Sequence, residues 1–516
     1  MIGPIPLLQD YLTDSARSHA DKVALVCGDL RITFGELDAR SDAVARHLAD
    51  GGVARGDRVL IFADNTIETV ISFWAALKAN AVACIINPLT KSDKLGYLLN
   101  DCRPTALLTD SHLLGVFGAP ARQYGSLRRL IISGEIDDCA MSELPNATRW
   151  EMAAAAHGAP PARLAIDIDL AAIIYTSGST GDAKGVMLTH RNMTAACESI
   201  AAYLALRDDD VILNVLPLAF DYGLYQMIMA FRTGARLILE RSFAFPAHVL
   251  DLVGIEGVTG FPGVPTIFAM LANLRSLKKY DLSSIRYVTN TAAALPLKHI
   301  RMLQDLFPDA RIYSMYGLTE CKRCTYLPPD DIDRKPLSVG VAIPNTEMWI
   351  VDEKDRRVEP GVVGQLVIRG ATVMKGYWGK PDATAAKLRP GPLPGEHVLY
   401  TGDYCRMDAD GYLYFIGRGD EIIKSRGEKV APREVENALL DIPGVSEAAV
   451  IGVPDDLLGQ AVKAFVVAEE GRILEERQLQ RECQRRLENF MVPKNIVIVP
   501  SLPRTDTGKL KKAALY

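Results

Sequence analysis

The sequence lacks the features that would place a protein in or across a membrane. A spanning helix needs roughly 20 apolar residues, and the most apolar run, residues 79–89, is interrupted by Asn80 and Asn87. The first residues, MIGPIPLLQDYLTD, contain no lysine or arginine and carry an aspartate at position 10, unlike a secretory signal peptide. We therefore expect a cytoplasmic protein without a transmembrane segment.

The sequence also lacks an excess of positive charge. It contains 58 lysines and arginines against 63 aspartates and glutamates, and it has no basic arm or charge block. No nucleic-acid partner is therefore expected. The nine cysteines are scattered, as in a reducing compartment. Cys321 and Cys324 form a lone C-x-x-C without the second ligand pair that a structural zinc site needs.

With 516 residues, the chain is too long for one compact core. Short β-rich runs alternate with helical patterns as far as residue 336, which predicts α/β layers with largely parallel sheets. From Leu337, strands punctuated by glycine and aromatic residues predict a small antiparallel β region over residues 337–418. We expect residues 1–419 to form a large N-terminal domain, and residues 420–516 a small α+β domain.

The most unusual stretch is IYTSGSTGDAKG, residues 174–185, with three glycines, four serine or threonine hydroxyls and one lysine. It follows a β-rich run and precedes residues 186–204, which we expect to be helical. Backbone N–H groups and hydroxyls in such a loop can donate to phosphate oxygens. A Walker A loop needs its lysine directly after a glycine. Lys184 follows Ala183, so the stretch is a phosphate loop of another kind.

Four further motifs follow along the chain. They are YSMYGLTE (313–320), YTGD (400–403), GRGDEIIKSRG (417–427) and PRTDTGKL (503–510). Together with the loop, they resemble in order and spacing the motifs of the AMP-forming acyl- and aryl-CoA synthetases, beetle luciferases and peptide-synthetase adenylation domains. The resemblance runs from about Thr33 to Lys511. It implies an enzyme that uses ATP and Mg²⁺ to activate a carboxylic acid.

The resemblance also implies a role for each motif residue. The glycine-rich loop embraces the β- and γ-phosphates of ATP, through Thr176, Ser177, Gly178, Ser179, Thr180, Gly181 and Lys184. In YGLTE, Tyr316 stacks on adenine beside Gly317, Thr319 meets the α-phosphate, and Glu320 holds magnesium. A hard carboxylate suits that metal. Asp403 accepts both ribose hydroxyls, and Arg418 contacts the ribose.

The C-terminal motifs imply a reaction in two steps. Lys509 matches the lysine that bridges the substrate carboxylate and the α-phosphate, and we assign catalytic roles to Lys509, Glu320, Thr176 and Lys184. Asp420 matches the hinge about which a mobile C-terminal domain rotates. Lys424 and Gly427 lie on the face used for thioester formation. The thiol there belongs to coenzyme A or to the phosphopantetheine of a carrier protein.

Residues 216–226, LPLAFDYGLYQ, resemble the stretch that begins the acid pocket and contain Phe220, Asp221 and Tyr222. In amino-acid-activating domains, an aspartate at the position of Asp221 pairs with the substrate's amino group. The alternative is a hydrogen bond to nearby backbone or to Tyr222. Further along, Asn290 and Thr291 replace two glycines common in the family, which should narrow or polarise the pocket.

Two enzyme hypotheses follow. The segment GEKVAPREVE, residues 427–436, resembles that of CoA ligases and favours a stand-alone acid–CoA ligase. The alternative is a stand-alone adenylation enzyme that loads an amino acid or another acid onto a carrier protein. A nucleotide-binding homologue without catalysis is disfavoured by the retained charged residues, which are Lys184, Glu320, Asp403, Arg418 and Lys509.

Overall fold

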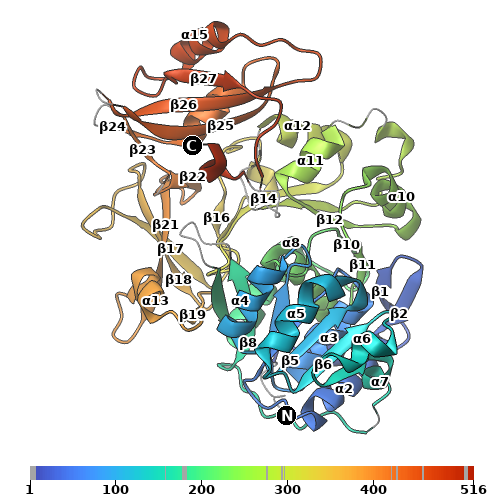
Figure 1. The fold of residues 1–516 in the computed structure, drawn as a ribbon. Coiled ribbons are helices and arrows are strands. Elements are labelled where there is room, and N and C mark those ends of the chain that lie inside the picture. The colour runs from blue at the N-terminus through green and yellow to red at the C-terminus, as the bar shows by residue number, and fades with distance from the viewer. Residues whose placement is uncertain are drawn as a thin grey trace.

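The structure is a computed structural model. It describes residues 7–156, 158–176, 183–272, 274, 277–291, 295, 297–419, 421–425, 428–455, 458–504 and 510–515. Two large mixed sheets, a small antiparallel sheet and a C-terminal sheet with its own helices make up the fold (Figure 1). Within the described ranges, no helix is both long and apolar enough to cross a bilayer.

The first large sheet has eight strands in the order β19-β9-β8-β4-β3-β5-β6-β7. Its parallel strands are β3 (Arg58–Phe62), β4 (Val82–Ile86), β5 (Ala106–Asp110), β6 (Arg129–Ser133), β7 (Ala147–Arg149) and β8 (Leu170–Thr176). Two antiparallel strands extend it, β9 (Lys184–Thr189) and β19 (Gly376–Tyr377). The helices along this part of the chain are α3 (Ile67–Lys78), α4 (Ser92–Cys102), α5 (Leu114–Tyr124), α6 (Asp138–Ser142) and α7 (Trp150–Ala154).

The second large sheet has nine strands in the order β16-β15-β14-β13-β12-β10-β11-β1-β2. Its strands are β1 (Val23–Cys27), β2 (Leu30–Thr33), β10 (Val211–Asn214), β11 (Arg236–Leu239), β12 (Gly260–Gly263), β13 (Tyr287–Asn290), β14 (Arg311–Tyr316), β15 (Thr325–Tyr326) and β16 (Val341–Ala342). The six from β14 to β1 run parallel. The associated helices are α1 (Asp10–Ser18), α2 (Phe34–Asp50), α8 (His190–Leu204), α9 (Asp221–Thr233), α10 (Pro246–Glu256), α11 (Pro265–Ala272) and α12 (Leu297–Leu306). One continuous apolar core joins the two sheets.

The small sheet is antiparallel throughout, as the sequence predicts for residues 337–418. It contains β17 (Thr346–Val351), β18 (Gly364–Gly370), β20 (Leu388–Pro390), β21 (His397–Met407) and β22 (Leu413–Arg418), with α13 (Pro381–Lys387) beside it.

The C-terminal part has a separate apolar core. Its elements are β23 (Ile423–Ser425), β24 (Glu428–Val430), α14 (Pro432–Leu440), β25 (Val445–Asp455), β26 (Gly459–Ala468), α15 (Glu476–Arg486) and β27 (Asn495–Ile498). It lies at one end of the molecule, where α14 packs against β22 (Figure 1). An ion pair of 2.5 Å joins Lys298 Nζ on α12 to Glu469 Oε1, which follows β26. The expected fold class, layered α/β followed by a small α+β unit, is confirmed.

The structure corrects the expected helix over residues 186–204. Its first part is the strand β9, which pairs antiparallel with β8, so the glycine-rich loop joins two strands of a hairpin. The helix α8 begins only after Thr189, whose hydroxyl accepts a hydrogen bond from the Asn192 backbone, while the Thr189 backbone N–H donates to Asn192 Oδ1. The element that follows the glycine-rich loop is therefore the strand β9 rather than a helix N-terminus.

Candidate functional site

The predicted site residues gather where parallel strands end. The strand β13 ends at Asn290 and β14 ends at Tyr316, paired in parallel, so their carboxyl ends lie at the same sheet edge. In open α/β sheets, ligands bind outside this edge. The first turn of α9, which carries Asp221 and Tyr222, reaches the same edge, because the Tyr222 hydroxyl lies 2.7 Å from Thr289 Oγ1.

Tyr316, Asp403 and Arg418 form one cluster. The Tyr316 hydroxyl donates to Asp403 Oδ2 at 2.5 Å, and Arg418 Nε lies 3.6 Å from Asp403 Oδ1. Pairing of β21 with β22 sets Asp403 directly opposite Arg418. Burial raises the pKa of Asp403, while Tyr316 and Arg418 act to lower it. Burial and the neighbouring Asp403 raise the pKa of Tyr316, so this phenol remains a donor.

The second oxygen of Asp403 has unused hydrogen-bonding capacity. Asp403 is 2% exposed, and its buried Oδ1 accepts no hydrogen bond from any described residue. Such an acceptor is costly unless a ligand or water donates to it. The cluster therefore suits a ligand that brings hydroxyl donors beside an aromatic ring, as a nucleoside does.

Tyr377 contacts both Glu320 and the hairpin formed by β8 and β9. Its hydroxyl donates to Glu320 Oε1 at 2.7 Å, and Lys184 Nζ lies 5.7 Å from the centre of its ring. At the root of the hairpin, Thr176 pairs with Lys184 and donates to its carbonyl at 3.5 Å. Burial and Glu320 raise the pKa of Tyr377 far above its usual value, which keeps it a donor. Sequence reasoning missed Tyr377, whose only signal is its place in the strand-like GYWGK.

A tight turn carries the residues between Tyr316 and β15. A side chain at Gly317 would bring its Cβ within 2.1 Å of the Lys322 carbonyl oxygen, so only glycine fits. Lys322 itself adopts a left-handed conformation, with φ of 64°. Thr319 and Glu320 lie half-buried in this turn. The turn therefore fixes both the glutamate and the residues that follow it.

Two cations border the predicted acid pocket. Lys322 Nζ lies 5.2 Å from the centre of the Tyr225 ring, and the Arg323 guanidinium lies 4.8 Å from that of Tyr222. Burial lowers the pKa of Lys322 to about 8, although nearby Asp221 acts to raise it. Asp221 thus has a positive neighbour within the protein. Sequence reasoning missed both cations, which stand directly after YGLTEC.

The other predicted pocket residues also lie at this edge. Phe220 is the half-buried N-cap of α9, while Asn290 and Thr291 are buried at the end of β13. Asn290 pairs with Ser314 on β14 and with Gly263 on β12. Polar groups therefore occupy the place where the family commonly has two glycines.

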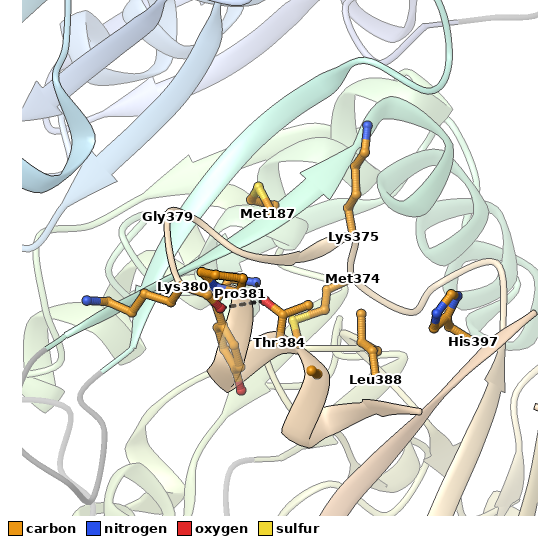
Figure 2. Close-up of a pocket in the computed structure, with 11 residues that line it drawn as sticks. Met187, Met374, Lys375, Gly379, Lys380, Pro381, Thr384, Leu388 and His397 are labelled. Atoms are coloured by element: carbon orange, nitrogen blue, oxygen red, sulfur yellow. Dashed lines mark hydrogen bonds between the residues drawn. The ribbon is translucent and has the colours of Figure 1, made fainter. Parts of the chain in front are cut away.

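A separate cavity of about 650 Å³ lies between β9, α13 and β21 (Figure 2). Tyr377 lines this cavity and also contacts Glu320, but none of the residues that line the cavity was predicted from the sequence as a site residue. Its two lysines, Lys375 and Lys380, point away from each other, so they do not converge on a common anion.

Some predicted residues lie outside the described part of the chain. They are Ser177, Gly178, Ser179, Thr180, Gly181, Asp420, Gly427 and Lys509, while Lys424 is described only as part of β23. Within the part that is described, no group of three or more histidine, cysteine or acidic side chains could hold a metal. Cys321 and Cys324 are buried with their sulfurs 3.0 Å apart.

Comparison with known proteins adds to this geometry. The AMP-binding enzyme family matches residues 12–378, and the AMP-binding enzyme C-terminal domain matches residues 434–509. The long-chain-fatty-acid–CoA ligase of Bacillus subtilis (strain 168) is 31% identical and covers 99% of this chain and 95% of its own. The oxalate–CoA ligase of Arabidopsis thaliana is 30% identical, over 98% and 97% respectively. ATP-bound MatB from Rhodopseudomonas palustris is similar in structure, with a TM-score of 0.87 at 29% identity over 98% of each chain. The chain therefore belongs to the AMP-binding enzyme family.

Proposed function

We propose that this protein is an ATP-dependent acid–thiol ligase that converts a carboxylic acid to acyl-AMP and then to its coenzyme A thioester. The observation that carries the proposal is the pair of adjoining clusters, one built on Asp403 and the other on Glu320. One suits a nucleoside, and the other presents a carboxylate and Lys184 to phosphates. Membership of the family and full-length similarity to CoA ligases support the same activity.

In the first step, a carboxylate oxygen of the acid attacks the α-phosphorus of ATP, and the bond to pyrophosphate breaks. Tyr316 and Asp403 orient the nucleoside, with Arg418 at the ribose. Lys184 and the hydroxyl of Thr176, beside the glycine-rich loop, face the phosphates and offset the charge that develops there. Groups fixed in advance around a developing charge stabilise the transition state without reorganisation.

Glu320 fits the part of a magnesium ligand. Tyr377 holds one of its oxygens at 2.7 Å and so orients the carboxylate. Protein sites for Mg²⁺ commonly use one or two carboxylates and complete the shell with substrate phosphates and water, which suits a single glutamate. Bound there, the ion would supply charge neutralisation to the phosphates.

In the second step, a thiol attacks the acyl carbon and AMP leaves. We assign residues 420–516 to a mobile domain, with Asp420 as its hinge, Lys509 serving the first step, and Lys424 and Gly427 serving the second. The described residues on either side of Lys509 are Arg504 and Leu510, which form a β-bridge, and Lys512 Nζ lies 3.5 Å from Glu421 Oε2. Glu421 follows β22, the strand that ends in Arg418.

The carrier-protein alternative depends on Asp221 if the acid is an amino acid. Lys322 and Arg323 disfavour that role, because a substrate ammonium beside Asp221 would also meet these two positive charges. The segment at residues 427–436 favours coenzyme A as the acceptor.

ATP–pyrophosphate exchange with fatty, aryl, dicarboxylic and amino acids tests the reaction. Thioester assays with coenzyme A and with phosphopantetheinylated carriers then test the acceptor. We expect exchange with at least one acid and transfer to coenzyme A. Transfer to a carrier alone would establish the alternative enzyme, and no exchange with any acid would favour a non-catalytic homologue. The cytoplasmic location stays a prediction, which cell fractionation can check.

A further inference from the structure

Two cations at the acid pocket have buried nitrogen atoms, Lys322 Nζ and Arg323 Nε, that find no hydrogen-bond partner among the described residues. Lys322 is 2% exposed and Arg323 is 3% exposed, and neither donates a hydrogen bond to any residue that the structure describes. A lysine ammonium has three N–H donors and a guanidinium has five. Buried donors are almost always paired in folded proteins. The two side chains therefore call for an acceptor that the protein does not provide among its described residues.

The neighbouring charges do not balance this pair. Asp221, at the start of α9, is the acidic group that acts most to raise the pKa of Lys322, and Glu320 acts less. Glu320 accepts a hydrogen bond from Tyr377, and the proposed function assigns it to the phosphates of ATP. Among the described residues, no ion pair joins an acidic side chain to Lys322 or Arg323, and Asp221 is the main negative group acting on Lys322. The remaining surroundings are aromatic, since the rings of Tyr222 and Tyr225 lie against Arg323 and Lys322.

The position of Lys322 and Arg323 indicates which part of the substrate acid they would contact. Lys322 and Arg323 lie between Glu320, which faces the phosphates, and the first turns of α9, where the acid is bound under the proposed function. An anionic group on the far part of the acid would enter the place where charge and donors are unmatched. A guanidinium can bind a carboxylate through two parallel hydrogen bonds.

We propose that the acid activated by this enzyme carries a second carboxylate, and that Lys322 and Arg323 bind it. The inference rests on the proposed function, since it names the substrate class of the same site. It also assigns the two residues to substrate specificity, while Lys184 and Lys509 serve the reacting carboxylate and the phosphates.

The test compares matched acids by ATP–pyrophosphate exchange with the full-length enzyme. The pairs are butanoate with butanedioate, hexanoate with hexanedioate, and benzoate with benzene-1,3-dicarboxylate. We expect at least one diacid to exceed its monoacid by about tenfold or more in kcat/KM. A preference for the monoacid in every pair would overturn the inference and leave the ligase function standing. No exchange with any acid would overturn the ligase function itself.

Variants then locate the preference. Lys322→Met and Arg323→Met keep much of the apolar volume and remove the charge. Each should reduce the diacid-to-monoacid ratio of kcat/KM by about tenfold or more, while Lys354→Met, at an exposed turn, should leave it unchanged. An unchanged ratio in both pocket variants would overturn the assignment. If neither variant folds, as judged by thermal unfolding with AMP, the preference of the unmodified enzyme decides the substrate class.

Discussion

The hydroxyl of Tyr316 donates to Asp403 Oδ2 at 2.5 Å, although the two residues are 87 positions apart. Tyr316 ends a strand of the nine-stranded sheet, whereas Asp403 lies in the small antiparallel sheet. The hydrogen bond therefore joins the two sheets at the cluster of Tyr316, Asp403 and Arg418, which we propose binds the nucleoside. It also uses one carboxylate oxygen and leaves the other, Oδ1, for a ligand.

Asp403→Asn should weaken ATP binding more than Tyr316→Phe does. The asparagine still accepts from Tyr316 but loses the charge that faces the ribose, and a hydrogen bond to a charged group contributes about 1.5–3 kcal/mol. We expect the KM for ATP to rise by about 10- to 100-fold in exchange assays. The phenylalanine variant keeps the ring and should lose less than about tenfold. The exposed Asp382→Asn is the control, and an equal effect in all three variants would contradict the assignment.

Glu320→Gln should raise the Mg²⁺ concentration needed for half-maximal exchange by about tenfold or more, because a neutral amide is a weaker ligand for this hard cation. Tyr377→Phe should raise it less, since the carboxylate remains but loses its anchor. A titration of exchange rate against Mg²⁺ measures both, with the exposed Glu359→Gln as the matched control. If the magnesium dependence of Glu320→Gln equals that of the control, Glu320 is not a ligand.

Lys509→Ala should abolish acyl-AMP formation and spare the reaction of synthetic acyl-AMP with coenzyme A. The lysine is assigned to the first step alone, in which it meets the charge between carboxylate and phosphate. Lys511→Ala, two residues further on and exposed, should retain both steps. Single-turnover measurements of each half-reaction separate the cases, and equal loss of both steps in Lys509→Ala would refute the assignment.

Gly317→Ala should destabilise the turn that carries Glu320 and Lys322. Its Cβ would lie 2.1 Å from the Lys322 carbonyl, so the backbone must shift. We expect the free energy of unfolding to fall by about 1–3 kcal/mol, together with loss of exchange activity. Gly96→Ala is the matched control, because it lies in α4 with open space around it and should be neutral or stabilising. Urea unfolding measures both, and a neutral Gly317→Ala would contradict the close contact.

Stability should fall between pH 6.5 and pH 4 through His190. Burial lowers its pKa from 6.5 to about 4, and its Nδ1 accepts a hydrogen bond from the Leu8 backbone at 3.2 Å. In this window the unfolded chain binds the proton and the folded chain does not, so the free energy of unfolding decreases as pH falls. The full effect is about 3 kcal/mol.

His190→Gln should flatten this dependence, since glutamine can accept the same bond without titrating. Denaturant unfolding at several pH values measures the slope, and the exposed His397→Gln provides the control. If the two variants show the same slope as the unmodified protein, His190 is not the group responsible.

Local signals in the sequence were sufficient for much of the fold. A capping box at Thr33 and Glu36 begins α2, and its spacing can be read from the sequence because its hydrogen bonds lie within four consecutive residues. The alternation of β-rich runs and helical patterns before residue 337 corresponds to the layered α/β sheets, and most of the strands within residues 337–418 form the small antiparallel sheet. The five motifs identified the family, since order and spacing along the chain are properties of the sequence alone.

Residues 186–189 show where local reasoning failed, because they were predicted as helix and form part of β9. These few apolar residues stand next to a helical segment, and an apolar run this short is compatible with a helix or with a strand. Antiparallel pairing with β8 makes these residues a strand, and this tertiary contact is not visible in the local sequence. The strand before the glycine-rich loop was thus predicted correctly, and the predicted helix directly after it was wrong.

What the sequence determined by itself is the family and its reaction class, through the order and spacing of the motifs that contain Lys184, Glu320, Asp403 and Lys509. What only the tertiary structure decided is the setting of these groups: Tyr377 as the anchor of Glu320, and the burial of Lys322 and Arg323 beside α9. Two adjacent cations in a sequence normally predict a solvated surface. Here the tight turn at Gly317 and the left-handed backbone of Lys322 direct the side chains of Lys322 and Arg323 into the protein. The path of the chain after a strand depends on backbone contacts that cannot be read from the amino-acid composition.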